Sequence, residues 1–93
     1  PGLRRPVVVV QGDAFNRSRI ATVVCVPLTS NLEWADAPGN VLPSARATGL
    51  EKESVANVPL VTALDRSQVV ERAGAITRRD LAYVITGLDV LLG

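Results

Sequence analysis

Two apolar runs near the start of the chain predict a pair of β-strands. Residues 6–11 contain four consecutive valines, and a second apolar run covers residues 20–28. Short continuous runs rich in β-branched residues are typical of strands that are covered on both faces. The intervening residues, 12–19, form a polar connection. We therefore expect these two strands to pair antiparallel.

The middle of the chain predicts less regular strands. The turn signal Ala37-Pro38-Gly39-Asn40 predicts a long exposed loop over residues 30–40. Proline has no backbone N–H to donate to a neighbouring strand, so Pro43 and Pro59 indicate edge positions or bulges. Further strands are expected over 41–45, 54–63 and 69–76, with a turn or single helical turn over 65–67.

The end of the chain carries the clearest helical pattern. Thr77 is a candidate N-cap, and Asp80 follows three residues later as in a capping box. Apolar residues then recur at spacings of three and four, so they share one helix face that is expected to pack on the sheet. They are Leu81, Val84, Ile85, Leu88 and Leu92. Strands followed by one terminal helix predict an α+β fold, a small curled antiparallel sheet or half-open barrel, in a single domain over residues 1–93.

The composition removes several classes of catalytic site. The chain has no histidine and one cysteine. It therefore lacks a Ser-His-Asp triad, a thiolate cluster and an internal disulfide. Cys25 lies in an apolar run and is expected to be a buried, inert thiol. An enzyme built from this chain works with arginine, hydroxyls, carboxylates and backbone amides.

No apolar run is long enough to span a bilayer, and no signal-peptide pattern opens the sequence. We therefore expect a cytoplasmic protein.

Charged and hydroxyl side chains lie at the ends of the first two predicted strands. Arg5 precedes the valine run, and Thr29 follows the second strand. The start of one strand and the end of its antiparallel neighbour meet at one rim of a sheet, where a guanidinium beside a hydroxyl is suited to hold a phosphate. Residues 1–19 carry four arginines against one aspartate, which indicates either nucleic-acid binding or a solvated surface.

Taken in order, the motifs of the chain resemble those of the MazF/PemK toxins of bacterial toxin–antitoxin pairs. The resemblance runs over all 93 residues and includes the amphipathic terminal helix. Its motifs are Arg5-Pro6 before the valines, Asn16, Val26-Pro27-Leu28-Thr29-Ser30-Asn31, Pro38-Gly39-Asn40-Val41, Thr48-Gly49-Leu50, Ser54-Val55-Ala56-Asn57-Val58 and Leu64-Asp65-Arg66. The resemblance implies an SH3-like antiparallel barrel with a C-terminal helix, assembled as a homodimer. It also implies metal-independent cleavage of single-stranded RNA at a short sequence, and a MazE-like antitoxin whose disordered tail covers the RNA groove.

The resemblance further implies two catalytic residues. Arg5 matches the family's catalytic arginine, and Thr29 matches its catalytic threonine. In such enzymes the ribose 2′-hydroxyl attacks the adjacent phosphate and leaves a 2′,3′-cyclic phosphate and a 5′-hydroxyl. A fixed guanidinium and a hydroxyl donor stabilise the charge that develops on the phosphate oxygens, while the identity of the general base stays open. The competing structural interpretation makes Arg5 a surface residue and Thr29 the cap of a turn.

RNA recognition is expected in the loop that follows Thr29. Single-stranded RNA is read by stacking bases on aromatic side chains and by hydrogen bonds to base edges. Trp34 offers an aromatic face, or else it is buried against the core or a partner subunit. The polar candidates of this loop are Ser30, Asn31 and Glu33. Arg17 and Arg19 either follow RNA phosphates or keep their own loop soluble.

Two features depart from the family pattern. Relatives usually carry a glutamine that faces the RNA groove, but residues 58–61 contain no amide side chain, so a different base preference is expected. Relatives also begin with a strand and a glycine-containing loop that gates the active site, and these precede the Arg-Pro step. The valine run of this chain indicates a strand with partners on both sides. We therefore expect the natural gene to encode an N-terminal strand and loop before Pro1.

Two other functional classes fit a fold of this kind. A CcdB-like toxin shares the fold but binds DNA gyrase without catalysis. It predicts an exposed aromatic residue at the end of the terminal helix, where this chain has Leu91-Leu92-Gly93. A plain SH3-like interaction module has no activity. The pairing of Arg5 with Thr29 favours the nuclease over both.

Overall fold

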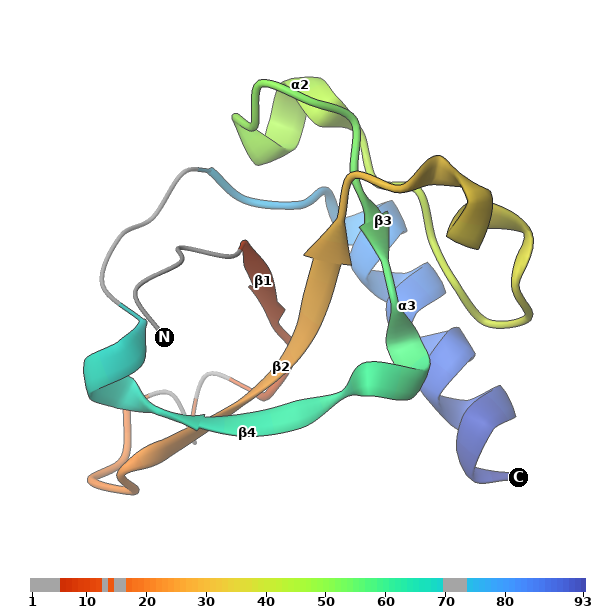
Figure 1. Cartoon of the computed structure of the whole chain (residues 1–93). Coiled ribbons are helices and arrows are strands. Elements are labelled where there is room, and N and C mark those ends of the chain that lie inside the picture. Colours follow the sequence, from red (N-terminus) through yellow and green to blue (C-terminus); the bar gives the residue numbers. More distant parts are fainter. Residues whose placement is uncertain (1–5, 13, 15–16, 70–73) are drawn as a thin grey trace.

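The computed structural model describes residues 6–12, 14, 17–69 and 74–93 of the 93-residue chain. In this part of the chain, an antiparallel sheet of four short strands packs with one long C-terminal helix (Figure 1). The elements, with 3-10 helices labelled η, are β1 (Val7–Val9), β2 (Thr22–Thr29), η1 (Leu32–Asp36), α2 (Ala45–Thr48), β3 (Val55–Ala56), η2 (Val58–Leu60), β4 (Thr62–Asp65), η3 (Arg66–Gln68) and α3 (Arg78–Leu92). The expected α+β class is confirmed.

The predicted pair of N-terminal strands is present. β1 runs antiparallel to β2, with Val8 opposite Val26, and both of these side chains are buried. The pairing extends past β1, because the Leu28 N–H donates to the Pro6 carbonyl at 3.0 Å. The end of β2 that carries Thr29 therefore lies beside Pro6.

β2 is long enough to pair with two strands along its other edge. β4 pairs with its first half, where Ala63 lies opposite Val24, and β3 pairs with its end, where Ala56 lies opposite Leu28. The prediction of one strand over residues 54–63 is therefore wrong. The 3-10 turn η2 separates β3 from β4, because Pro59 within η2 has no N–H for a strand ladder.

Two other predicted strands are missing from the described residues. Only Val41 of the expected strand 41–45 pairs with the sheet, and it exchanges both backbone hydrogen bonds with Ala56, at 3.3 and 2.7 Å. Pro43 follows, and the chain then enters α2, which the sequence pattern does not predict. Of the expected strand 69–76, residues 69 and 74–76 lie outside any strand, and residues 70–73 lie outside the described part. The helical turn expected near 65–67 is η3.

α3 begins where the sequence predicts. The Asp80 N–H donates to the hydroxyl of the N-cap Thr77 at 3.1 Å. Val84 is fully buried between α3 and the sheet, and it joins a core cluster formed with Val26, Ala56 and Val58.

The packed face of α3 differs from the predicted stripe. Ile85 and Leu92 are 41% and 80% exposed, whereas Asp80 and Gly87 are buried. The helix presents this face because Gly87 lies directly against Gly39, where a Cβ on Gly87 would overlap the Gly39 carbonyl oxygen. Gly39 itself has a φ of +83°, a left-handed conformation that favours glycine. At this point α3 and the loop that contains Gly39 therefore approach each other backbone against backbone.

Asp80 joins α3 to α2. Its carboxylate accepts a hydrogen bond from the Ser44 N–H at 2.9 Å, and the Ser44 carbonyl accepts from Ala47 and Thr48 at the start of α2. Buried carboxylates are normally satisfied in this way. Asp80 thus has a structural role.

Candidate functional site

A groove of about 640 Å³ opens at the end of β2. It is lined by Pro6, by the last residues of β2, by one residue of η1 and by residues between 50 and 60. Of the residues expected to act on RNA, Thr29, Ser30 and Trp34 lie in this lining. The groove therefore brings together part of the predicted catalytic and recognition sites.

Thr29 is the last residue of β2 and is half-buried in the groove wall. Its Oγ1 accepts a hydrogen bond from the Asn31 N–H at 3.2 Å, which fixes the turn out of the strand. A hydroxyl that accepts one hydrogen bond can still donate its own hydrogen. Thr29 can therefore cap the turn and also donate to a ligand in the groove.

Trp34 contributes to the groove from η1. Its side chain is 50% exposed, so it is not buried in the core of its own chain. Asn31 is the N-cap of η1, because its Oδ1 accepts from the Glu33 N–H at 3.2 Å. This cap holds the turn that carries the tryptophan, and the exposed indole is suited to stack on a planar ligand.

Lys52 and Glu51 bring one positive and one negative charge to the groove lining. Both lie in the loop between α2 and β3, and the Ser54 hydroxyl donates to the Lys52 carbonyl at 3.3 Å. Among the described residues that line the groove, Lys52 is the only cation. An ammonium on a flexible stem can reach a phosphate held near Thr29.

The other predicted site residues lie elsewhere. Asn31 and Glu33 are exposed in the first turn of η1 and do not line the groove. Arg17 and Arg19 are exposed and precede β2. The first residue of β2 lies roughly 23 Å from Thr29, its last residue, at a rise of about 3.3 Å per residue. RNA contacts by these four residues stay predictions. Arg5 lies outside the described residues.

The groove residues that follow α2 are not among the site residues that the sequence predicts. Leu50, Lys52, Asn57 and Leu60 line the groove, and they come from a segment with no regular hydrophobic spacing. Residues 58–61 lack an amide side chain, but Asn57, directly before them, lies in the lining. Leu50 and Asn57 belong to two of the motifs that carry the family resemblance, whereas Lys52 and Leu60 lie in none of them.

Comparison with known proteins identifies the family. Residues 1–92 match the family described as PemK-like, MazF-like toxins of type II toxin–antitoxin systems. The chain belongs to this family. Endoribonuclease MazF2 of Mycobacterium bovis and endoribonuclease MazF6 of Mycobacterium tuberculosis are each 40% identical to it over 92 residues, which cover 99% of this chain and 81% of each relative.

A solved structure shows that this toxin also has the family fold. The Mycobacterium tuberculosis toxin MazF-mt6 matches it with a TM-score of 0.82, over 95% of this chain and 85% of that one. At 15% sequence identity this likeness bears on the fold alone. The expected MazF/PemK membership and the expected small antiparallel barrel with a C-terminal helix are confirmed.

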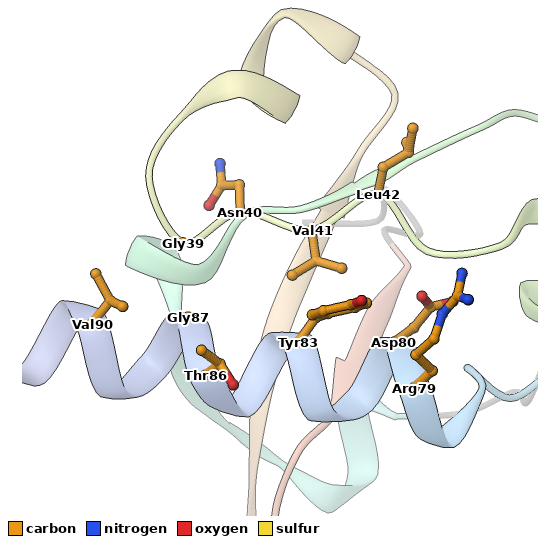
Figure 2. A pocket seen from close by; sticks show the side chains of 10 residues that line it. All are labelled: Gly39, Asn40, Val41, Leu42, Arg79, Asp80, Tyr83, Thr86, Gly87 and Val90. Atoms are coloured by element: carbon orange, nitrogen blue, oxygen red, sulfur yellow. The ribbon is translucent and has the colours of Figure 1, made fainter.

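A second hollow of this MazF-like toxin, of about 470 Å³, lies between α3 and residues 39–42 (Figure 2). Val41 points toward α3, whereas Asn40 and Leu42 point away from it. The buried carboxylate of Asp80 at this hollow already binds the Ser44 N–H. None of its ten lining residues carries a buried side-chain polar atom without a partner. The groove at the end of β2 is therefore the stronger candidate in this toxin.

Other kinds of site are not supported in the described part of the toxin. It contains no group of three or more His, Cys, Asp or Glu side chains that could hold a metal ion. Cys25 is fully buried, and burial raises the pKa of its thiol, which disfavours the reactive thiolate. None of the described helices is both long and apolar enough to cross a bilayer.

Proposed function

We propose that this toxin is a sequence-specific endoribonuclease that cleaves single-stranded RNA in the cytoplasm without a metal ion. Its family and the endoribonucleases among its relatives support this activity. The observation that carries the proposal is the groove at the end of β2, where Thr29, Lys52 and the exposed Trp34 line one space. A hydroxyl and a cation suit a phosphate, and an exposed indole suits a base.

The proposed reaction is a displacement at phosphorus. The ribose 2′-hydroxyl gives up its proton and forms a bond to the adjacent phosphorus, as the bond to the 5′-oxygen of the next nucleotide breaks and that oxygen takes up a proton. The products are a 2′,3′-cyclic phosphate and a 5′-hydroxyl. In this reaction the Thr29 hydroxyl donates to a non-bridging oxygen as negative charge develops there. Arg5 immediately precedes the groove residue Pro6, and its permanently protonated guanidinium is assigned to the same phosphate.

The proposal is tested with a labelled RNA and the purified protein in excess EDTA. We expect cleavage at a short recurrent sequence, with cyclic phosphates on one set of fragments and 5′-hydroxyls on the other. The second set would accept phosphate directly from a polynucleotide kinase. Cleavage that requires added magnesium, or fragments with 5′-phosphates, would contradict the mechanism. Gyrase inhibition without RNA cleavage would instead indicate a CcdB-like toxin.

We also propose that the toxin is a homodimer. Several large apolar side chains at the end of α3 are exposed, among them Val90, Leu91 and Leu92. A domain of 93 residues has a small core and gains stability by burying such side chains between subunits. Light scattering at micromolar concentration is expected to give twice the mass of one chain, and a monomer under these conditions would contradict the proposal.

Membership of a type II toxin–antitoxin family implies an antitoxin partner. We propose a MazE-like antitoxin with an acidic and partly apolar segment that becomes ordered across the groove. Lys52 and the exposed Leu60 in the groove lining suit such a segment. RNA and the antitoxin segment are expected to compete, and the antitoxin is expected to bind more weakly as salt increases. An antitoxin complex that keeps full RNA affinity would contradict this proposal.

A further inference from the structure

The side chain of Asn40 connects two walls of the groove. It points away from α3, toward η1 and the end of β3 (Figure 2). Its Nδ2 donates to the Trp34 carbonyl at 2.9 Å and to the Asn57 Oδ1 at 3.3 Å, and its Oδ1 accepts from the Val58 N–H at 2.9 Å. Trp34 and Asn57 both line the groove, whereas Asn40 does not.

The backbone partners fix the orientation of both amide groups. A carbonyl can only accept and an N–H can only donate, so the bonds to Trp34 and Val58 decide which atom of Asn40 is nitrogen. The nitrogen of Asn40 then faces Asn57, which requires that the Asn57 oxygen faces Asn40. The Asn57 Nδ2 is the remaining end of that amide, and no hydrogen bond occupies it among the described residues.

Asn57 lies close to the proposed reaction centre. Its N–H donates to the Pro27 carbonyl at 2.9 Å, so it is held beside β2 two residues before Thr29. Two residues of a strand extend about 7 Å. A nucleotide next to the phosphate at Thr29 can therefore place its base against Asn57.

We infer that Asn57 is a specificity-determining residue whose Nδ2 donates to a keto oxygen of an RNA base, O4 of uracil or O6 of guanine. This inference rests on the proposed RNA cleavage. Cytosine and adenine carry an amino group at the corresponding position, and two facing donors repel. The hydrogen-bonding groups of Asn57 fit a keto oxygen as the partner. The bond from Asn40 occupies the Asn57 Oδ1 acceptor and leaves the Nδ2 donor for the RNA.

The test compares wild type with Asn57→Asp on a randomised RNA pool, with the fragment ends sequenced. Aspartate still accepts from Asn40, but it presents an acceptor to the groove in place of a donor. We expect preference at one position of the cut sequence to move from uracil or guanine toward cytosine or adenine, while the other positions stay unchanged. Cleavage of the wild-type sequence is expected to fall about tenfold, the usual effect of losing one hydrogen bond.

Gln68→Glu is the matched control for the added charge. Gln68 is exposed in η3, outside the groove, and its Oε1 accepts from the Asp65 N–H at 3.1 Å, a role that glutamate keeps. Its cut sequence and rate are expected to match wild type. If Asn57→Asp does not fold, wild type is given RNA in which the preferred uracil or guanine carries sulfur in place of the keto oxygen. Sulfur is a weaker acceptor, so cleavage should again fall.

The outcomes separate this inference from the proposed function. An Asn57→Asp protein that cuts the wild-type sequence at the wild-type rate would overturn the inference alone. So would an equal loss on all sequences with an unchanged preference, because that pattern indicates a merely structural role. Full cleavage of the thio-substituted RNA would also overturn it. A wild type that cuts no RNA would overturn both the inference and the proposed function.

Discussion

An Arg5→Ala protein is expected to lose RNA cleavage by about 100-fold or more while it keeps its fold. The loss of one preorganised donor from a site that stabilises a developing oxyanion typically costs about 10²-fold or more in rate. Arg5→Lys is expected to restore little, because an ammonium lacks the planar pair of donors that a guanidinium presents to a phosphate. The measurement is the cleavage rate of a labelled RNA by variants whose circular dichroism and unfolding temperature match wild type.

Thr29, which lines the groove, gives a second test of the same site. Thr29→Val keeps the shape and removes the hydroxyl, so cleavage should fall about 10²-fold. The lost acceptor for the Asn31 N–H should lower the free energy of unfolding by only about 1 kcal/mol. Thr29→Ser keeps the hydroxyl and should remain active. Wild-type rates in a folded Arg5→Ala protein, or an active but destabilised Thr29→Val, would leave these residues with structural roles only.

Gly87→Ala is expected to destabilise the protein by about 2 kcal/mol, which corresponds to an unfolding temperature roughly 10 °C lower. In the interior of an unobstructed helix, the same change stabilises by about 1 kcal/mol, because alanine loses less conformational entropy than glycine. Here the new methyl group would overlap the backbone of Gly39, and backbone cannot move aside as a flexible side chain can. The measurement is thermal unfolding followed by circular dichroism.

Gly12→Ala is the control for this stability prediction. A Cβ at Gly12 has no heavy atom within 4 Å, and the Gly12 backbone does not require glycine. Its unfolding temperature is expected to stay near that of wild type. A Gly87→Ala protein as stable as wild type would show that α3 can move away from the loop without cost, and that the contact between the two glycines does not position the helix.

The sequence alone was sufficient for the elements whose stability is local. Continuous β-branched residues predicted β1 and β2, and their pairing followed because the connection between them is short. Thr77 and Asp80 predicted the start of α3, because an N-cap satisfies N–H groups within the same turn. The absence of histidine already restricted the chemistry to hydroxyls, carboxylates, amides and cations, and the ordered motifs indicated the family.

The part of the site that depends on local sequence could also be predicted, and the part that depends on strand pairing could not. The apolar pattern marks where β2 ends, and Thr29 and Trp34 lie at or just after that end. Their position at the rim of the sheet could therefore be predicted from the sequence. Lys52 and Asn57 reach the groove only because β3 pairs with the last residues of β2. That pairing joins segments far apart in the chain, and no spacing within either segment encodes it.

The tertiary structure alone decided how the helix and the later strands are placed. Hydrophobic spacing predicted the type of element over 54–63 and 78–92, but β3 and β4 separate at Pro59 because each pairs with a different half of β2. The spacing also predicted a packed stripe through Ile85, whereas the buried face centres on Val84 and Gly87. A hydrophobic stripe reports which residues favour burial. Which of them is buried depends on where two backbones can approach, and here that place is set by Gly39 and Gly87.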